Sequence, residues 1–449
     1  MTNIITAERD QMMLMPPSIR EWLPEGHLAM FVGDIVDQLD LRNIEQQYRG
    51  SGKSAYSPAL LLSLLFYGYA TGVFGSRKIE AATYDSIAFR YLSGDTHPDH
   101  DTIAAFRRRF LEELKGLFVQ ILMIAREMGC AKVGTVSIDG TKVQANASKH
   151  KAMSWAYANR LEKQLRKEIG ELLRKAEKAD QSEADAELDI PHEIALRGKR
   201  LEKIEEAKRA LKERAAQRHE EAKRLYEERK RRREEKAQAG DRGQGKPPTP
   251  PAQTGPEPGD QHNFTDGESR IMKSHGAFEQ CYNGQVAVDV EDMLIVGTSL
   301  TNNASDAGSL LPTLDDVTNN VESPGCVLAD SGYYSEGNLN GCESRNVEAY
   351  LAVGRDKHNA PLKARHRKRP PQSMSPARKL MWHRLRSEIG KELYRVRKST
   401  AEPAIGIIKE AMGFRRFLLR GITKAAGEWN LTCLAYNVRR LHQIRLATA

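Results

Sequence analysis

Apolar residues recur at helical spacing along the first part of the chain. After Ser57 and Pro58 come Leu60, Leu61, Leu64, Leu65 and Tyr69, which fall on adjacent turns of one helix. Pro58 suits the first helical position because a helix start leaves that N–H unbonded in any case. A later helix is expected over Ile103 to Phe110, capped by Asp101 or Thr102. Residues 16 to about 128 are therefore expected to be helical.

The middle of the chain changes character twice. Residues 132 to 144 are rich in β-branched side chains in partial alternation, which predicts the first strand. From Lys149 to about Lys236 the chain is dense in Ala, Leu, Glu, Lys and Arg, so we expect two long solvated helices. They would form a hairpin around the break at 189–191. Ala239 to Gln261 is rich in proline and glycine and is expected to be a flexible linker.

Strand and helix patterns alternate in the last third. Two β-rich runs, Gly284 to Asp289 and Leu294 to Leu300, flank an acidic turn and predict a hairpin. The further expected elements are helices over 305–321 and 335–345, strands over 325–329 and 347–353, and helices from 376 to the end. This order predicts a mixed α/β domain. The expected division is 1–128 helical N-terminal domain, 129–144 first core strand, 145–280 helical hairpin and linker insertion, and 281–449 the remainder of the core with C-terminal helices.

The charge balance adds a candidate partner. The 69 Lys and Arg residues outnumber the 60 Asp and Glu, which gives a net charge of +9 and favours a polyanion such as nucleic acid. The five cysteines are scattered and never form a Cys-x-x-Cys pair, so we interpret them as reduced, mostly buried thiols of a cytosolic protein. We expect no signal peptide, membrane span or structural zinc site.

Three acids stand where metal ligands would be useful. Asp139 follows the strand pattern Val133 to Ile138, Asp330 follows a second, and Glu402 begins a helix pattern. The carboxyl ends of strands are where α/β sheets display their functional groups. Carboxylate oxygens are suitable ligands for Mg²⁺. A pair of Mg²⁺ ions can promote the cleavage of a phosphodiester bond. Each acid also has a structural interpretation. Asp139-Gly140 is a strong turn signal, Asp330-Ser331-Gly332 is a common loop opening, and an acid stabilises a helix start such as that of Glu402.

Short motifs in a fixed order strengthen the functional interpretation. They are Tyr56-Ser57-Pro58, Asp99-His100-Asp101-Thr102-Ile103 with Phe106 and Arg107, 137–143 around Asp139, Asn263 to Asp266, Tyr282 to Gln285, Asp306, Ala329 to Tyr334, and Tyr394 to Lys409. Together they resemble the DDE transposases of bacterial insertion sequences, in the group with a helical N-terminal domain and a C-terminal Tyr-Arg-Glu-Lys pattern. Tyr394 and Arg397 each stand one residue further from Glu402 than in the usual pattern, whereas Lys409 keeps its spacing.

The resemblance implies a ribonuclease-H-like catalytic core with Asp139, Asp330 and Glu402 as the catalytic and metal-binding triad. It implies two Mg²⁺ ions, for which Mn²⁺ can substitute, and cleavage of element ends followed by attack of their 3′ hydroxyls on target DNA. Asp266 and Asp306 recur in the resemblance too, but turn formation and helix capping account for them.

The expected DNA contacts near these motifs are one tyrosine and several basic residues: Tyr394, Lys409, Arg397, Arg107, Arg108, Lys142, Arg367 and Lys368, the last two within the basic run Lys363 to Arg369. The expected partners are double-stranded DNA, as transposon ends and target, and a second copy of the chain, because two ends must be held together. The expected location is cytoplasmic, on the nucleoid. Two alternatives stay open at this stage: a metal-dependent nuclease without strand transfer, and an inactive DNA-binding relic.

Overall fold

The computed structural model describes residues 18–48, 55–179, 190–238, 247–251, 255–274, 276–353, 370 and 375–448. The chain forms two compact units. The first comprises 1–145, 272–276 and 281–449, and the second comprises 146–271 and 277–280. The helical N-terminal region therefore shares a unit with the sheet that carries the candidate acids, while most of the charge-dense insertion forms a unit of its own.

Helices make up the N-terminal region, as the sequence predicts. They are η1 (Ile19–Trp22), α1 (Leu28–Asp37), α2 (Arg42–Glu45), α3 (Pro58–Thr71), α4 (Ser76–Asp85), α5 (Ile87–Ser93), α6 (His100–Arg109) and α7 (Glu113–Glu127). Helix α3 begins at Pro58 and is buried from Leu61 to Ala70, because α1, α5 and the C-terminal helix pack around it. The cap of α6 differs from the prediction. Its first turn is closed by Asp99, whose carboxylate accepts the N–H of Thr102 at 2.8 Å.

A mixed sheet forms the core of the first unit. Its strands are β1 (Thr135–Gln144), β4 (Arg270–Ser274), β5 (Ala277–Asp289), β6 (Ile295–Thr301), β7 (Cys326–Ala329) and β8 (Glu348–Leu351). The order is β4-β5-β1-β7-β8, with β6 also paired to β5. β5 runs antiparallel to β1 and β6, while β7 is parallel to β1 and β8. The hairpin and the two short strands predicted from the sequence are confirmed, and the order is consistent with a ribonuclease-H-like core.

Strand β1 overturns the turn interpretation of Asp139-Gly140. The strand continues unbroken to Gln144, and Asp139 and Gly140 pair with Val286 and Gln285 on β5. Asp139 therefore lies inside a strand and not at its end. The local preference of Asp-Gly for a turn is overridden because β5 supplies ladder partners on both sides of this dipeptide.

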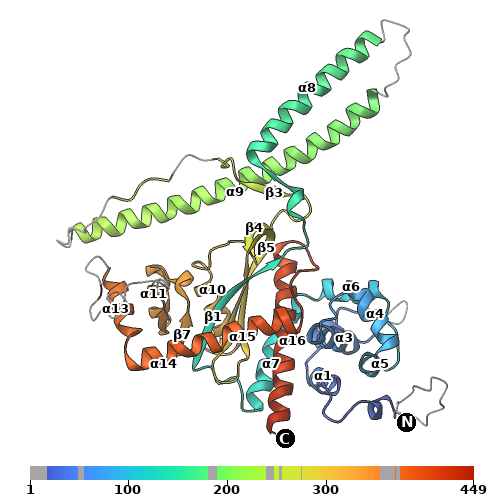
Figure 1. Cartoon of the computed structure of the whole chain (residues 1–449), viewed down its shortest axis with the longest axis vertical. Coiled ribbons are helices and arrows are strands. Elements are labelled where there is room, and N and C mark those ends of the chain that lie inside the picture. The colour runs from blue at the N-terminus through green and yellow to red at the C-terminus, as the bar shows by residue number, and fades with distance from the viewer. Residues whose placement is uncertain are drawn as a thin grey trace, which may run out of the picture. The chain divides into compact units, whose positions relative to one another are not determined.

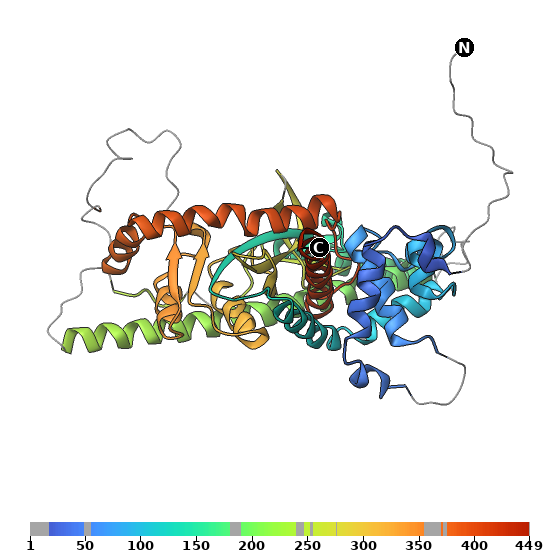
Figure 2. The same cartoon turned by 90° about the horizontal axis from the view of Figure 1, so that it is seen from below.

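Helices flank the sheet and complete the unit. They are α10 (Leu310–Asn320), η3 (Ser331–Tyr333), α11 (Glu336–Glu343), α13 (Pro376–Arg384), α14 (Glu388–Val396), η4 (Arg397–Ser399), α15 (Ala401–Gly406), the π-helical turn η5 (Ile407–Ala411) and α16 (Ile422–Thr448). Helix α10 starts later than predicted, because Asp306 to Ser309 forms a turn in which the N–H of Ser309 bonds to the carbonyl of Asp306. Figures 1 and 2 show α16 in red beside the sheet, and it packs against α3, α7 and β6.

The second unit is built on the predicted helical hairpin. It contains η2 (Lys149–Lys151), β2 (Ala152–Ser154), α8 (Trp155–Ala179), α9 (Ile190–Gln238) and β3 (Gln261–Asn263). The two long helices, green in Figure 1, pack through Ala158, Leu161, Leu165 and Ile204. The expected break at 189–191 falls at the start of α9, and residues 180–189 lie outside the described ones. The end of the predicted linker is anchored rather than free, since Asp260 forms two hydrogen bonds with Arg218.

A buried polar network joins the N-terminal helices to α16. Glu428 on α16 accepts hydrogen bonds from the Tyr69 hydroxyl at 2.8 Å and from the N–H groups of Leu418 and Leu419 at 2.9 Å each. The guanidinium of Arg107 donates to the same Tyr69 oxygen at 3.0 Å. Burial raises the pKa of Glu428 above its usual value. Three chain segments far apart in sequence are thus held at one buried carboxylate.

Other features of the chain fit a packed interior. All five cysteines are free and buried, which confirms the prediction that they are mostly buried thiols. Within the described ranges, no single helix is long and apolar enough to cross a membrane; one bent pair, Pro58–Thr71 with Ser76–Asp85, meets the length and composition test only when combined.

The buried Asp289 at the end of β5 gives a pH-dependent prediction. Burial, and then the nearby Asp292 and Glu291, raise its pKa from 3.8 to about 6. A raised carboxyl pKa favours the folded state below the unfolded pKa, and this stability is lost as pH rises through 6. The unfolding free energy of the wild type should therefore fall by about 2 kcal/mol between pH 4 and pH 7, relative to Asp289→Asn. Urea unfolding of both proteins at each pH measures this difference. A difference that stays constant from pH 4 to pH 8 would contradict the prediction.

Candidate active site

Asp139 and Asp330 lie side by side on adjacent parallel strands. β1 and β7 pair in register up to Ile138 and Ala329, so the two aspartates are the next residues on each strand. β7 ends there, and the chain turns into η3, where the Asp330 carboxylate accepts the N–H of Gly332 at 2.6 Å. The acid pair thus stands at the carboxyl end of β7, the edge at which α/β sheets display functional groups.

The environment of Asp139 disfavours a bare negative charge. Burial raises its pKa from 3.8 to about 6; the hydrogen bond from the N–H of Gly140 and the charge of Arg397 oppose this rise, whereas Asp330 and Glu402 add to it. Asp330 and Glu402 are therefore both close enough to Asp139 to raise its pKa. An uncompensated carboxylate in such a place is stabilised by a cation or by a proton.

Glu402 enters the site from α15, which packs on β1. It is exposed, and its Oε1 lies 3.3 Å from Nη2 of Arg397, whose side chain is buried. The Arg397 guanidinium also lies over the ring of Tyr394, 5.5 Å from its centroid. Burial raises the pKa of Tyr394, with further contributions from Asp330 and Glu402. Tyr394, Arg397 and Glu402 are thus brought together at the acid pair.

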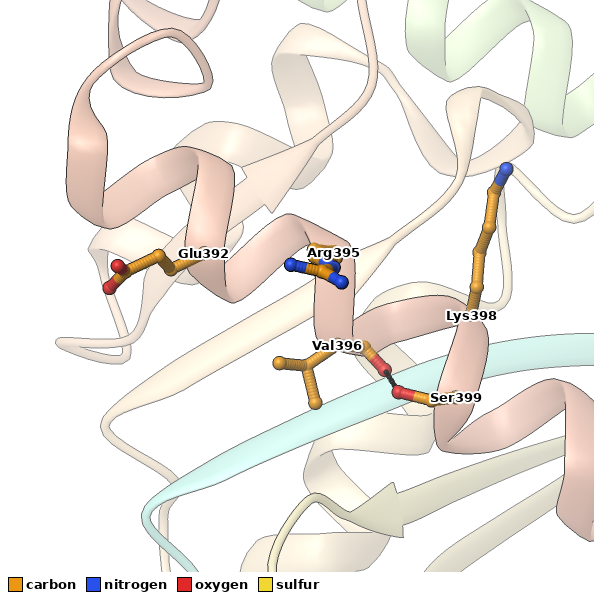
Figure 3. A pocket seen from close by; sticks show the side chains of 5 residues that line it. All are labelled: Glu392, Arg395, Val396, Lys398 and Ser399. Atoms are coloured by element: carbon orange, nitrogen blue, oxygen red, sulfur yellow. Dashed lines mark hydrogen bonds between the residues drawn. The ribbon is translucent and has the colours of Figure 1, made fainter.

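The one-residue offset of Tyr394 and Arg397 has a structural explanation. The 3-10 turn η4 lies between α14 and α15 and interrupts the regular α-helical spacing. Arg397, five positions before Glu402, therefore forms a hydrogen bond with the Glu402 carboxylate. Arg395 and Lys398, which occupy the usual positions of the Tyr and the Arg, line an open hollow with Glu392, Val396 and Ser399 instead (Figure 3). In that hollow Ser399 donates to the carbonyl of Val396 at 2.9 Å. The hollow contains none of the three acids.

The donor chemistry of the acids fits a hard divalent cation, but the site is not assembled around one. Asp139, Asp330 and Glu402 offer the carboxylate oxygens that Mg²⁺ and Mn²⁺ prefer. Among the described residues, no group of three or more His, Cys, Asp or Glu is spaced to hold a metal ion. Oε1 of Glu402 is paired with Arg397 in this arrangement.

The two lysines expected to grip DNA have partners within the protein. Lys409 lies in the π-helical turn, and its Nζ donates to the carbonyl of Lys142 at 3.0 Å. Burial lowers its pKa. Lys142 lies on β1 and pairs with Asp306 at 3.1 Å. The sequence predicted two regular helical turns between Glu402 and Lys409. This spacing is not kept, because the π-helical turn contains one residue more than an α-helical turn.

The remaining expected DNA contacts divide into three cases. Arg107 is buried, and its Nη1 donates to Tyr69 and to the carbonyl of Phe74, so the phosphate contact expected of it is corrected to a role in packing. Its neighbour Arg108 is exposed at the end of α6. Arg367 and Lys368, with the whole basic run 363–369, lie outside the described residues.

Sequence reasoning undervalued Asp306. Its Oδ1 accepts hydrogen bonds from Asn283 at 2.6 Å, from Gln285 at 3.1 Å and from Lys142 at 3.1 Å. Gln285 in turn accepts a hydrogen bond from the hydroxyl of the buried Tyr333. Burial is the main cause that raises the pKa of Tyr333, so this hydroxyl keeps its proton and remains a donor. The signal in the sequence was the polar Asn283 and Gln285 inside a β-rich run.

Two family models match the chain. The first, described as Transposase domain (DUF772), matches residues 17–109, the N-terminal helices. The second, described as Transposase DDE domain, matches residues 248–438 and includes Asp330 and Glu402. The chain carries a DDE transposase domain and is a transposase. Enzymes of this family typically depend on a divalent metal, and transposase activity implies that DNA is bound.

The matched regions leave Asp139 outside both. Asp139 lies between the two matched regions, so the family models do not cover it. Its position beside Asp330 comes from the register of β1 with β7 in the transposase. No curated protein and no solved structure matches the transposase in the other two comparisons.

Proposed function

We propose that the transposase cuts the ends of an insertion sequence and joins the freed 3′ hydroxyls to target DNA, with Asp139, Asp330 and Glu402 as its catalytic acids. The observation that carries this proposal is the register of β1 and β7, which sets Asp139 beside Asp330 where β7 ends. The rise in the pKa of Asp139 to which Asp330 and Glu402 contribute supports it. In this proposal, Asp139, Asp330 and Glu402 would hold two Mg²⁺ or Mn²⁺ ions through their carboxylate oxygens.

The metal ions, when bound, supply activation of the attacking oxygen and stabilisation of the leaving oxyanion. The residues of the chain position them and the DNA. Arg397 holds Glu402 at the edge of the site, and Tyr394 packs against the Arg397 guanidinium.

DNA binding in this proposal is electrostatic. The proposed phosphate contacts are Arg108, Lys142, Lys409, Arg397 and Tyr394. Arg367 and Lys368, which lie outside the described residues, are proposed as well. Such binding weakens steeply as salt rises, because each contact releases condensed counterions. Two element ends must be held at once, so a dimer or larger assembly on DNA is proposed, acting in the cytoplasm on the nucleoid. The insertion 145–280 is a candidate for binding the element ends, and the N-terminal domain 1–128 is a second candidate for DNA contact. The core stretches 129–144 and 281–449 carry the three acids.

The experiment follows labelled element-end duplexes with target plasmid, with Mg²⁺, with Mn²⁺ and without metal. The proposal expects metal-dependent nicking and a joined product that carries the label in the target DNA. Nicks without joined product would replace it with a nuclease that does not transfer strands. DNA binding without cleavage under every metal condition would favour an inactive relic.

A further inference from the structure

A second carboxylate system lies against the acid pair, on the other side of strand β1. Asp139 and Gly140 are consecutive in β1, so their Cα–Cβ directions point to opposite faces of the sheet. Gly140 and Lys142 share one of these faces. On β5, Gln285 stands opposite Gly140, and Asn283 stands opposite Lys142.

Asp306 lies directly over this face. A Cβ at Gly140 would be 2.5 Å from Nε2 of Gln285 and 2.9 Å from Oδ1 of Asp306, so the missing side chain of Gly140 makes the room that these two groups occupy. Asn283 and Gln285 are fully buried, whereas Asp306 keeps 28% of its side chain exposed. The Asp306 carboxylate is therefore held by the side-chain amides of Asn283 and Gln285, which are buried, and by Lys142.

The charge on Asp306 fixes which way Gln285 points. An ionised carboxylate only accepts hydrogen bonds, so it draws the NH₂ group of Gln285 toward itself and turns the amide oxygen the other way. That oxygen accepts the hydrogen bond from the Tyr333 hydroxyl. Without an acceptor at Asp306, the Gln285 amide is free to turn over, and the bond that the Tyr333 hydroxyl donates to its oxygen is then lost.

Tyr333 belongs to the loop that carries Asp330. Its backbone N–H bonds to the carbonyl of Asp330 at 3.3 Å, and Gly332 donates to the Asp330 carboxylate. Asp306 also faces this loop directly, because a Cβ at Gly332 would lie 3.6 Å from its Oδ2. Asp306, Gln285 and Tyr333 thus form a chain of contacts from β5 to the Asp330 loop.

We propose that Asp306 is a positioning residue that, through Gln285 and Tyr333, holds the Asp330 loop against the strand that bears Asp139. The role rests on the proposed function of the acid pair and deepens it. Asp306 does not touch the reacting atoms in this role. It sets the separation of the two aspartates before any cation arrives, in the way that outer partners orient the ligands of metal sites.

The test compares Asp306→Ala, Asp306→Asn and Tyr333→Phe with the wild type. Asp306→Ala should slow end cleavage by about 10- to 100-fold and raise the Mg²⁺ concentration needed for half-maximal rate. Asp306→Asn keeps one oxygen acceptor and should recover part of this loss. Tyr333→Phe removes only the hydroxyl and should shift both quantities in the same direction. DNA affinity measured by gel shift should stay within about twofold, because no proposed phosphate contact is removed.

A second measurement needs neither DNA nor metal. Hydrogen exchange of the peptide covering 330–334 should be faster in Asp306→Ala and Tyr333→Phe than in the wild type, because the loop has lost its anchor. The matched control is Asp315→Ala, since Asp315 is an exposed carboxylate on α10 that pairs with Arg345 away from the acids. It should leave exchange of this peptide and the cleavage rate unchanged.

Exchange at wild-type rates in Asp306→Ala would overturn the positioning role, whatever happens to cleavage. An unchanged metal requirement in all three variants would overturn it as well. The proposed function fails by a different result, namely cleavage that survives Asp139→Ala, and the exchange measurement stays informative in that case because it is made on the metal-free protein.

Discussion

Asp139→Asn and Asp330→Asn are each expected to reduce metal-dependent cleavage of element ends by about 10³-fold or more, while DNA binding persists. Both aspartates lie side by side where β7 ends next to β1, and Asn keeps the volume but removes the charge that a divalent cation needs. Metal-ion stabilisation contributes several kcal/mol to phosphodiester cleavage, and each 1.36 kcal/mol corresponds to about tenfold in rate. Single-turnover cleavage of a labelled end duplex, with gel-shift affinity on the same protein, measures both quantities.

Glu402→Gln tests the third acid separately, because Glu402 is exposed and paired with Arg397. The same loss of cleavage is expected of it. The matched control is Glu410→Gln, a nearby exposed glutamate that pairs with Arg415, and this change should leave the rate within about twofold. If one acid variant cleaves at the wild-type rate, that residue is not part of the triad; if the control loses as much as the three acids, the loss does not come from metal binding.

Glu428→Ala is expected to lower the free energy of unfolding by about 3 to 5 kcal/mol, because it removes the acceptor of a buried polar network. The Tyr69 hydroxyl and the N–H groups of Leu418 and Leu419 would keep no carboxylate to bond with. Arg107, whose positive charge opposes the rise in the pKa of Glu428, would lose this nearby carboxylate. Urea unfolding followed by tryptophan fluorescence reports the change, since Trp429 is the next residue on α16.

Two further variants make this prediction specific. Glu428→Gln keeps one acceptor oxygen and should lose less than Glu428→Ala. Glu410→Ala removes an exposed ion pair and should change the unfolding free energy by less than about 1 kcal/mol. A loss for Glu428→Ala no larger than that for Glu410→Ala would mean that the network does not hold the N-terminal helices to α16.

Local sequence signals predicted many elements because those elements rest on local chemistry. Pro58 and the leucines after it mark α3, and the β-branched run before Asp139 marks the start of β1. The acidic turn near Glu291 marks the hairpin of β5 and β6, which the structure confirms. In each case periodicity and turn residues lie within a few positions of one another, so one sequence window contains the whole signal.

The errors share a different physical cause. Asp139-Gly140 has the composition of a turn, but pairing with β5 keeps it extended. Arg107 has the charge of a surface residue, but Tyr69, distant in sequence, gives it a buried partner. Asp306 has the composition of a helix start, yet Lys142, which it contacts, is 164 residues away in the chain. Nothing within a local window distinguishes these residues from ordinary turn, surface and capping positions.

By itself the sequence determined the alternation of strands and helices, the charge-dense insertion and the resemblance to a transposase family. Periodicity, composition and ordered motifs are local properties, so each can be recognised without the fold. Only the tertiary structure decided that Asp139 stands beside Asp330 and that η4 lets Arg397 reach Glu402. It also decided that Asp306 packs against Gly140 of β1 and Gly332 of the Asp330 loop. Those relations depend on strand register and on hydrogen bonds between distant segments, and such long-range pairing is settled when the whole sheet packs.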